Sequence, residues 1–293
     1  MRTVKTCVGR LEISTKQAKK LNLDKGRRIS KNLENNCLLL GANESFSNAA
    51  KDLEQLTGLK IGKSTIHRQA IACEIPAPST KKVVTSLAVD GGNIRVRTPL
   101  GEPSIWKNYK AIQIYDDVGF ACFQTNQILE SWINEQPLGR VVTCLGDGHK
   151  GIWNLIDNVG NSSQRREVLD WYHLKENLYR VGGSIKRLLR AETHLWHGDI
   201  EAALAEFDGC KGKQKRLSNF RSYLYYHQNR IPDYSLYQLL CIPIGSGAVE
   251  SLIKRINQRV KITGAQWKHE NISQILKLRC AYLNYHGLTS IYA

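Results

Sequence analysis

The order of β-type and helix-type segments between residues 81 and 173 constrains the fold of this chain most. Runs rich in β-branched and aromatic residues lie at 83–89, 93–98, 109–115, 118–124, 141–146 and, as EVLDWYH, at 167–173. Helix-length segments at 125–138 and 149–160 separate the later runs. The early runs are closely spaced, as in a meander, whereas the later ones are joined through helices. We therefore expect an α/β fold with a mixed sheet flanked by helices.

The rest of the chain divides around this region. The first 36 residues are polar and basic, Pro76 and Pro78 mark a linker, and 174–243 has an almost wholly helical pattern. A Gly-Ser-Gly turn then leads into one more helix. The expected segments are a basic arm (1–36), a helix-turn-helix-like segment (37–80), a first core part (81–173), an all-α insertion (174–243) and a completion of the core (244–293).

The stretch SFSNAAKDLEQLTGLKIGKSTIHRQAI predicts two short helices joined by a turn at Gly58. Ser64 is the expected N-cap of the second helix, and a further helix at 32–41 is needed to complete a three-helix core. This arrangement resembles a helix-turn-helix, whose second helix reads DNA. Two packed helices that touch no DNA are an alternative. The candidate reading face carries Lys63, Ser64, His67 and Arg68.

Positive charge is concentrated at two places. The chain has 42 Lys and Arg against 26 Asp and Glu, a net charge of +16. Residues 1–36 hold ten basic and three acidic side chains, and 251–279 hold seven and one, while 37–173 hold fourteen of each. Clustered positive charge suits a polyanion such as nucleic acid. The simpler alternative is a basic surface that only faces water.

Cysteine usage and hydropathy favour a cytoplasmic protein. The eight Cys include no C-x-x-C pair, and Cys122 and Cys144 lie in apolar runs, so they are expected to be buried thiols in a reducing compartment. A zinc knuckle or a disulfide framework is not expected. The sequence shows neither an 18-residue apolar stretch nor a signal peptide, which predicts a protein that is neither membrane-spanning nor exported.

Three carboxylates are placed where they could hold divalent metal. Asp90 and Asp147 each follow a β-type run and precede Gly, and Glu250 opens a helix after the Gly-Ser-Gly turn. Two Mg²⁺ ions held by such hard oxygen ligands can stabilise both the attacking and the leaving oxygen of a phosphodiester. The adjacent glycines would let a phosphate approach closely. An Asp-Gly pair is more often a simple turn, and Asp116-Asp117 is expected to be one, in a hairpin.

Four ordered motifs carry a resemblance to a known family. The spans VDGGNIRVR, GDGHKGIW, LDWYH and GSGAVES are similar to DDE transposases of bacterial insertion sequences, most of all the ISKra group, over about residues 40–285. The resemblance implies a ribonuclease H-like core with a helical insertion before the last acidic residue. It implies that Asp90, Asp147 and Glu250 bind two Mg²⁺ ions, for which Mn²⁺ would substitute. It further implies cleavage and transfer of double-stranded DNA ends by a dimer or larger assembly bound to DNA.

Other side chains are candidates for support or for DNA contact. Asp170 and His173 match an Asp-x-x-His signature, which would position DNA or support the site, although a core histidine paired with a carboxylate is equally plausible. His149 would contact a phosphate or cap a helix, and Trp153 is expected in the core. Trp267 would stack on an unpaired base or, more commonly, pack against the sheet edge. The basic stripe expected to contact the DNA backbone is Lys254, Arg255, Arg259 and Lys261.

Two other functions remain open from the sequence. A decayed or domesticated copy would bind DNA without cutting it. A ribonuclease H-like nuclease would hydrolyse RNA–DNA hybrids or branched DNA without joining strands.

Overall fold

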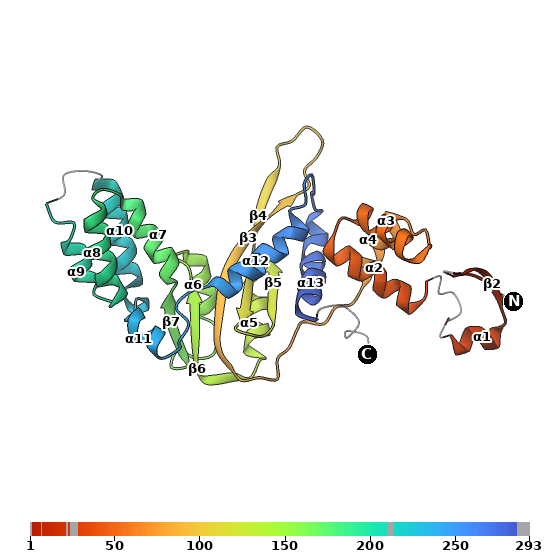
Figure 1. The fold of residues 1–293 in the computed structure, drawn as a ribbon, viewed down its shortest axis with the longest axis horizontal. Helices are drawn as coiled ribbons and strands as arrows, with labels where there is room; N and C mark the ends of the chain where they lie inside the picture. Colours follow the sequence, from red (N-terminus) through yellow and green to blue (C-terminus); the bar gives the residue numbers. More distant parts are fainter. Residues whose placement is uncertain (1, 7, 22, 24–28, 210–213, 286–293) are drawn as a thin grey trace. The chain divides into compact units, whose positions relative to one another are not determined.

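The computed structural model describes residues 2–6, 8–21, 23, 29–209 and 214–285 (Figure 1). The chain forms two structural units. Unit 1 comprises Met1–Pro78, Asn93–Asn108 and Lys254–Ala293, and unit 2 comprises Ser79–Gly92 and Tyr109–Ile253. The expected completion segment 244–293 is thus divided, because only its part up to Ile253 belongs to unit 2.

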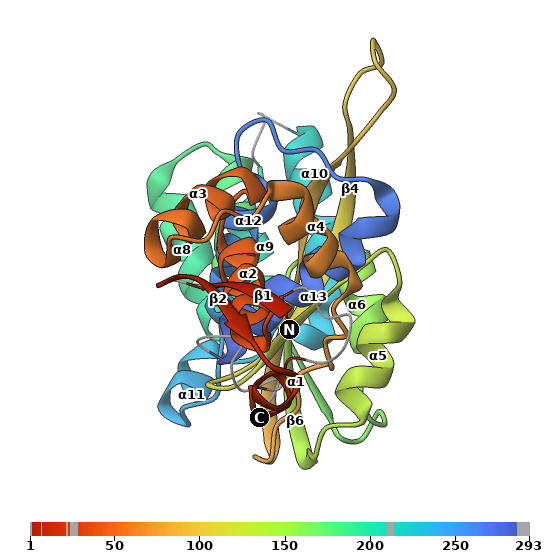
Figure 2. The same cartoon turned by 90° about the vertical axis from the view of Figure 1, so that its right-hand side faces the viewer.

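A five-stranded mixed sheet forms the centre of unit 2. Its order is β5-β4-β3-β6-β7, with β3–β6 and β6–β7 parallel and β4–β5 antiparallel. Helices α5 and α6 lie side by side (Figure 2). The predicted α/β class, with a mixed sheet flanked by helices, is confirmed. The run EVLDWYH, predicted as a strand, is one only up to Leu169, because Asp170 caps α7, which begins at Trp171. The elements are β3 (Val84–Val96), β4 (Ile105–Ile114), β5 (Gly119–Phe123), α5 (Asn126–Asn134), β6 (Leu138–Gly146), α6 (Lys150–Ile156) and β7 (Arg165–Leu169).

The runs predicted as two strands at 83–89 and 93–98 are a single strand, β3. The break expected at Gly91-Gly92 does not occur, and the ring of Tyr109 on β4 occupies the space beside Gly92. A Cβ atom there would lie 2.4 Å from that ring. Between β4 and β5, Asp116 has a φ of 53° and Asp117 N–H donates to Ile114 O, so the predicted hairpin turn is confirmed.

The segment 174–243 is helical, as its pattern predicts. Figure 1 shows α8, α9 and α10 side by side, and α7 packs against both α8 and α10. An aromatic cluster of Trp171, Trp196 and Tyr234, with ring centroids 4.8–6.1 Å apart, ties α7, α8 and α11 together. The elements are α7 (Trp171–Val181), α8 (Ile185–Trp196), α9 (Ile200–Ala205), α10 (Gln214–His227), η1 (Gln228–Arg230) and α11 (Tyr234–Leu239).

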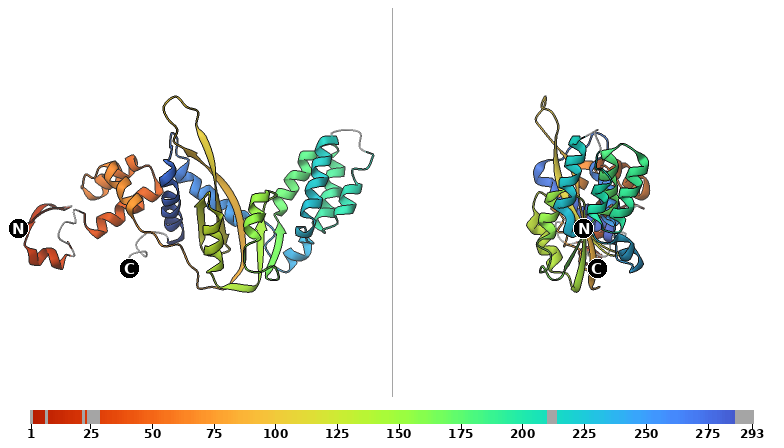
Figure 3. Two further views of the ribbon diagram at one scale, coloured as in Figure 1. Left: turned by 180° about the vertical axis from the view of Figure 1, so that it is seen from behind. Right: turned by 90° about the vertical axis from the view of Figure 1, so that its left-hand side faces the viewer.

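Unit 1 contains three packed helices, α2 (Lys31–Asn43), α3 (Phe46–Thr57) and α4 (Lys63–Ala72) (Figure 3). Ala49, Leu53 and Ile66 are buried between them, whereas Leu56 is exposed because it points away from the core. Gly58, with a φ of 68°, ends α3 as predicted. The predicted cap of α4 is wrong: Gly62 is the N-cap, and Ser64 lies within the first turn.

The segment expected to be a basic arm contains regular structure in its described residues. Strands β1 (Arg2–Thr6) and β2 (Gly9–Ile13) form an antiparallel hairpin, and α1 (Thr15–Lys20) follows with a capping box at Ser14. Helix α2 already begins at Lys31, so the boundary expected at residue 36 is wrong. The predicted helix at 32–41 lies wholly inside α2.

Two buried arginines fix the end of α2 to the C-terminal helices of unit 1, which are the later part of α12 (Gly247–Val260) and α13 (His269–Tyr285). Arg259 Nε donates to Gly41 O at 2.9 Å. Arg279 Nη1 donates to Ala42 O at 3.3 Å and to the side chain of Asn43 at 2.9 Å. These cations meet the carbonyl groups at the negative end of the α2 dipole, which a guanidinium stabilises.

Cys122 and Cys144 are buried, as predicted, and Cys7 and Cys210 lie outside the described residues. Within the described part of the chain, none of the helices has both the length and the apolar character needed to cross a membrane.

Candidate functional site

Strand register in unit 2 places three aspartates at one level of the sheet. Val89 of β3 pairs with Gly146 of β6, which in turn pairs with Leu169 of β7. The residues that come next in the chain are Asp90, still within β3, and Asp147 and Asp170, directly after β6 and β7. Neighbouring strands lie about 4.8 Å apart, so the three backbones are adjacent where the parallel pairing ends. The site therefore begins as a row of carboxylates across β3, β6 and β7.

Asp90 lies within β3 and not at its end, which corrects the expectation of a strand terminus. It is nevertheless at the end of the parallel ladder with β6, because β6 stops at Gly146. Its carboxylate is partly buried, and burial raises its pKa above the usual value. The negative charges of Asp147 and Glu250 raise the pKa further, while the Gly91 N–H and His173 lower it. Asp90, Asp147 and Glu250 are thus near enough to interact electrostatically.

Asp147 follows β6 directly and shapes the loop before α6. Its Oδ1 accepts from His149 N–H at 2.8 Å, and its carbonyl accepts from the indole of Trp153 at 2.7 Å. His149 is the N-cap of α6 and accepts from Gly151 N–H at 3.1 Å, so it has the capping role foreseen for it. Trp153 is buried, as predicted. These contacts fix Asp147 next to the end of β6.

Asp170 is fully buried and joins two parts of unit 2. It is the N-cap of α7, where Oδ1 accepts from His173 N–H at 2.7 Å, and its Oδ2 accepts from Ser246 N–H. The imidazole Nδ1 of His173 lies 3.2 Å from Oδ1. Burial alone would raise the pKa of Asp170, but the hydrogen bonds from His173 and Ser246 outweigh it and lower the pKa. Asp170 is therefore an anion in the folded protein.

The surrounding carboxylates favour the protonated form of His173. Its close contact with Asp170 raises its pKa from 6.5 to about 9 against the effect of burial, and Asp147 and Glu250 add to the rise. The imidazolium partly compensates four carboxylates, those of Asp90, Asp147, Asp170 and Glu250. The cluster keeps an excess of negative charge, which attracts divalent cations.

Glu250 follows the turn at Ser246, whose N–H donates to Asp170 Oδ2. It lies in the first turn of α12, as predicted, where its N–H donates to Ser246 O at 3.1 Å. The Ser246 hydroxyl lies 3.5 Å from its Oε1. Ligand atoms of Asp170, His173 and Glu250 all lie within 4.8 Å of one another. Among the described residues, this is the group of possible metal ligands, and Glu250 is the one expected ligand that belongs to it. Asp90 and Asp147 lie outside this group, although their charges act on one another and on Glu250.

Three of the glycines beside the aspartates, Gly92, Gly146 and Gly148, make room for side chains of unit 2. A Cβ at Gly148 would lie 2.3 Å from the ring of Tyr223 on α10. A Cβ at Gly146 would lie 2.8 Å from Ile152 on α6. With Tyr109 beside Gly92, the close neighbour in each case is a side chain of unit 2.

Two residues at this site carry no recognisable sequence signal. Tyr223 contacts the Asp147–His149 loop from α10, and the buried His227 interacts with Gly148. Burial lowers the pKa of His227 from 6.5 to about 4, and the charge of Arg230 contributes. Both residues lie more than 70 positions from Asp147, so only the folded chain brings them to it.

The residues predicted to contact DNA lie in unit 1 and differ in exposure. Lys63 and Arg68 on α4 are exposed, as are Lys254, Arg255 and Lys261. His67 is only partly exposed, with its ring 5.1 Å from that of Phe46, and burial lowers its pKa. The exposed cations are accessible to a polyanion.

Arg259 and Trp267 do not fit their predicted roles. Arg259 is 2 % exposed, between the rings of Phe46 and Trp267 at 4.8 and 4.9 Å, so it is no part of an exposed stripe. Trp267 is 7 % exposed, donates to Val260 O at 2.9 Å and pairs with Val96 of β3. It packs against the edge of the sheet, the alternative foreseen for it, so its ring is not open for base stacking.

A comparison of the sequence with protein-family models and with curated proteins finds no match.

Proposed function

We propose that the chain cuts and joins DNA strands as a DDE-type transposase, with the catalytic site in unit 2. The observation that carries this proposal is the row of Asp90, Asp147 and Asp170 across three parallel-paired strands, completed by Glu250. The order of strands and helices agrees with a ribonuclease H-like core, and the helices α7–α11 occupy the place of the expected insertion.

The donor set fits divalent metal. Asp90, Asp147 and Glu250 would hold Mg²⁺ or Mn²⁺, since carboxylate oxygens are the ligands that these hard cations prefer. Metal bound there would activate a water or a 3′-hydroxyl and stabilise charge on the phosphate. The buried Asp170 orients the turn that carries Glu250, and it holds the imidazolium of His173 in the cluster. In that position His173 can donate a proton or a hydrogen bond to a phosphate oxygen.

The exposed cations of unit 1 support DNA as the substrate. Helix α4 presents Lys63 and Arg68 in a helix-turn-helix-like group, and Lys254, Arg255 and Lys261 add a second basic surface. Such side chains bind backbone phosphates without requiring a particular sequence. A dimer on DNA would follow from the need to hold two ends together.

The test is nicking of supercoiled plasmid DNA and transfer of a labelled duplex with a free 3′-hydroxyl into plasmid, each with Mg²⁺ or Mn²⁺. Asp147→Asn keeps the acceptor for His149 N–H but removes the charge, so we expect cleavage to fall at least about a hundredfold. Asp157→Asn, an exposed position at the other end of α6, is the matched control and should cleave normally.

The two other functions predict different results. DNA binding with no nicking by the unmodified protein supports a non-catalytic DNA-binding protein. Hydrolysis without joining supports a nuclease. Nicking by Asp147→Asn at the rate of the unmodified protein refutes the assignment of the site.

A further inference from the structure

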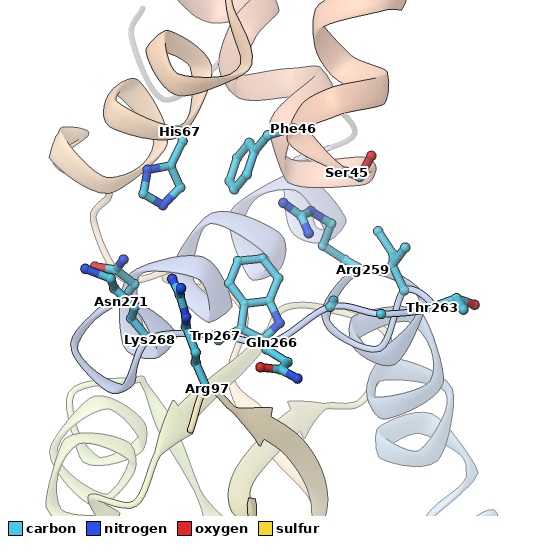
Figure 4. Close-up of a pocket in the computed structure, with 13 residues that line it drawn as sticks. Ser45, Phe46, His67, Arg97, Arg259, Thr263, Gln266, Trp267, Lys268 and Asn271 are labelled. Carbon is cyan, nitrogen blue, oxygen red and sulfur yellow. The ribbon is translucent and has the colours of Figure 1, made fainter. Parts of the chain in front are cut away.

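A pocket of about 440 Å³ lies within unit 1, and none of the four carboxylates of the cluster in unit 2 lines it. Its walls come from the start of α3, from α4, from the end of β3 and from the segment between α12 and α13. Figure 4 shows Phe46 and His67 on one side and Trp267, Arg97 and Lys268 on the other. Its volume is that of a pocket for a small ligand or for one residue of a polymer.

Arg259 is one of the residues that line this pocket. It points between the rings of Phe46 and Trp267 (Figure 4), and the side chain is 2 % exposed. Its Nε donates to Gly41 O, whereas Nη2 is buried and has no hydrogen-bond partner among the described residues. A buried guanidinium nitrogen without an acceptor is costly, and an anion would supply the missing one.

The charged side chains that line the pocket beside Arg259 have the same sign. Arg97 and Lys268 line the pocket and are exposed, and none of the described residues that line it has a carboxylate. Two carboxylates lie nearby: Glu44 acts on Arg259, and Glu270 lies 3.7 Å from Lys268 at the surface. Burial lowers the pKa of Arg259 to about 10, and the charge of Arg279 contributes. Ser45, Gln266 and Asn271 add neutral hydrogen-bonding groups.

We propose that this pocket binds a phosphate group. Guanidinium and ammonium groups donate charge-assisted hydrogen bonds to phosphate oxygens. The exposed Arg97 offers the planar fork that matches two of these oxygens, and Arg259 contributes its positive charge from the wall of the pocket. The neutral amides and hydroxyl complete the contacts without bringing repulsive charge. The volume leaves room for a group attached to the phosphate. Under the proposed function, the phosphate group belongs to the DNA backbone. Only this identification of the phosphate as DNA rests on the proposed function.

The direct test uses inorganic phosphate on the full chain in EDTA, at constant ionic strength. A ligand that binds only the folded state raises Tm in a saturable way. We expect a saturable rise for the unmodified protein and its loss in Arg97→Gln/Lys268→Gln, whose positions are exposed. The control Lys51→Gln/Lys60→Gln removes the same charge from exposed positions of unit 1 outside the pocket and should keep the rise. An equal response of all three proteins, or no saturable rise, overturns the inference.

A second measurement distinguishes the source of the phosphate. For duplex DNA, the slope of log K against log salt becomes shallower by about 0.9 for each phosphate that the protein no longer neutralises. The pocket variant should therefore show a slope at least about one unit shallower than that of the control variant. Equal slopes, with the inorganic phosphate effect intact, would remove DNA as the source and leave a free phosphate compound.

Failure here and failure of the proposed function give different results. Asp147→Asn should lose DNA cleavage and keep the phosphate-dependent rise in Tm. Normal cleavage by a protein whose Tm does not respond to phosphate would overturn the pocket and leave the catalytic site standing.

Discussion

The pairing of Asp170 with His173 makes a specific prediction about stability and pH. The imidazole pKa rises from 6.5 to about 9 chiefly through the close contact of its Nδ1 with Asp170 Oδ1. A shift of that size corresponds to about 3 kcal/mol, which we reduce to about 2 kcal/mol because the His173 side chain is 32 % exposed and its charge is screened by solvent. Asp170→Asn keeps the shape and removes the charge, so the raised pKa should be lost.

The sign follows from linkage. A group whose pKa is raised on folding contributes its full stability below the unfolded value of 6.5 and loses it as the pH rises through about 9. The free energy of unfolding of the unmodified protein should therefore fall between pH 6 and pH 9.5 by about 2 kcal/mol more than that of Asp170→Asn. Urea unfolding in EDTA measures it, and groups that titrate alike in both proteins cancel in the difference.

A second Asp–His pair provides the control. His197 Nδ1 lies 3.8 Å from Asp233 Oδ1, but both side chains are exposed. Asp233→Asn should leave the pH dependence unchanged, since exposed pairs contribute little. The same decline with pH in Asp170→Asn and in the unmodified protein would show that Asp170 does not set the charge of His173.

Three other changes test packing inside each unit. Gly148→Ala should lower the free energy of unfolding by about 1–3 kcal/mol and slow DNA cleavage, because its Cβ would meet the Tyr223 ring at 2.3 Å. A second change in the same chain, Tyr223→Leu, should recover part of both losses, as measured by urea unfolding and plasmid nicking. The lowered pKa of His227, about 4, predicts stability that is full above pH 6.5 and falls as the pH drops toward 4, by at most about 3 kcal/mol; His227→Gln should remove this part of the pH profile. Arg279→Met should cost about 3 kcal/mol, because the carbonyl groups of Ala42 and Arg255 lose their donor. Loss of the exposed Arg255 side chain should stay within about 0.5 kcal/mol.

The order of elements could be predicted because each has its own periodicity and boundary residues. The alternation of strands with α5 and α6 follows from local pattern, and Gly58 and the Asp116-Asp117 turn mark their boundaries by backbone preference. Strand β3 was wrongly divided, because Gly91-Gly92 has the local pattern of a break. The Tyr109 ring from the neighbouring strand fills the space beside Gly92, and local pattern does not reveal such contacts across a sheet.

The candidate site was predictable only in part. The positions after β-type runs indicated Asp90 and Asp147, and the Gly-Ser-Gly turn indicated Glu250. How closely Asp170 and His173 join Glu250 depends on a hydrogen bond to Ser246, 76 residues from Asp170. Tyr223 and His227 had no motif at all. Charge also misled: Arg259 was expected at the surface, but two aromatic rings and a helix end bury it.

The amino-acid sequence by itself determined the succession of strands and helices, the excess of positive charge and the residues able to bind a cation, because these depend on residue type and short-range spacing. Tertiary structure alone decided which carboxylates share one cluster, which glycines make room for a ring and which arginine is buried. Those outcomes depend on contacts between residues distant in the chain, where burial and hydrogen bonding outweigh local preference.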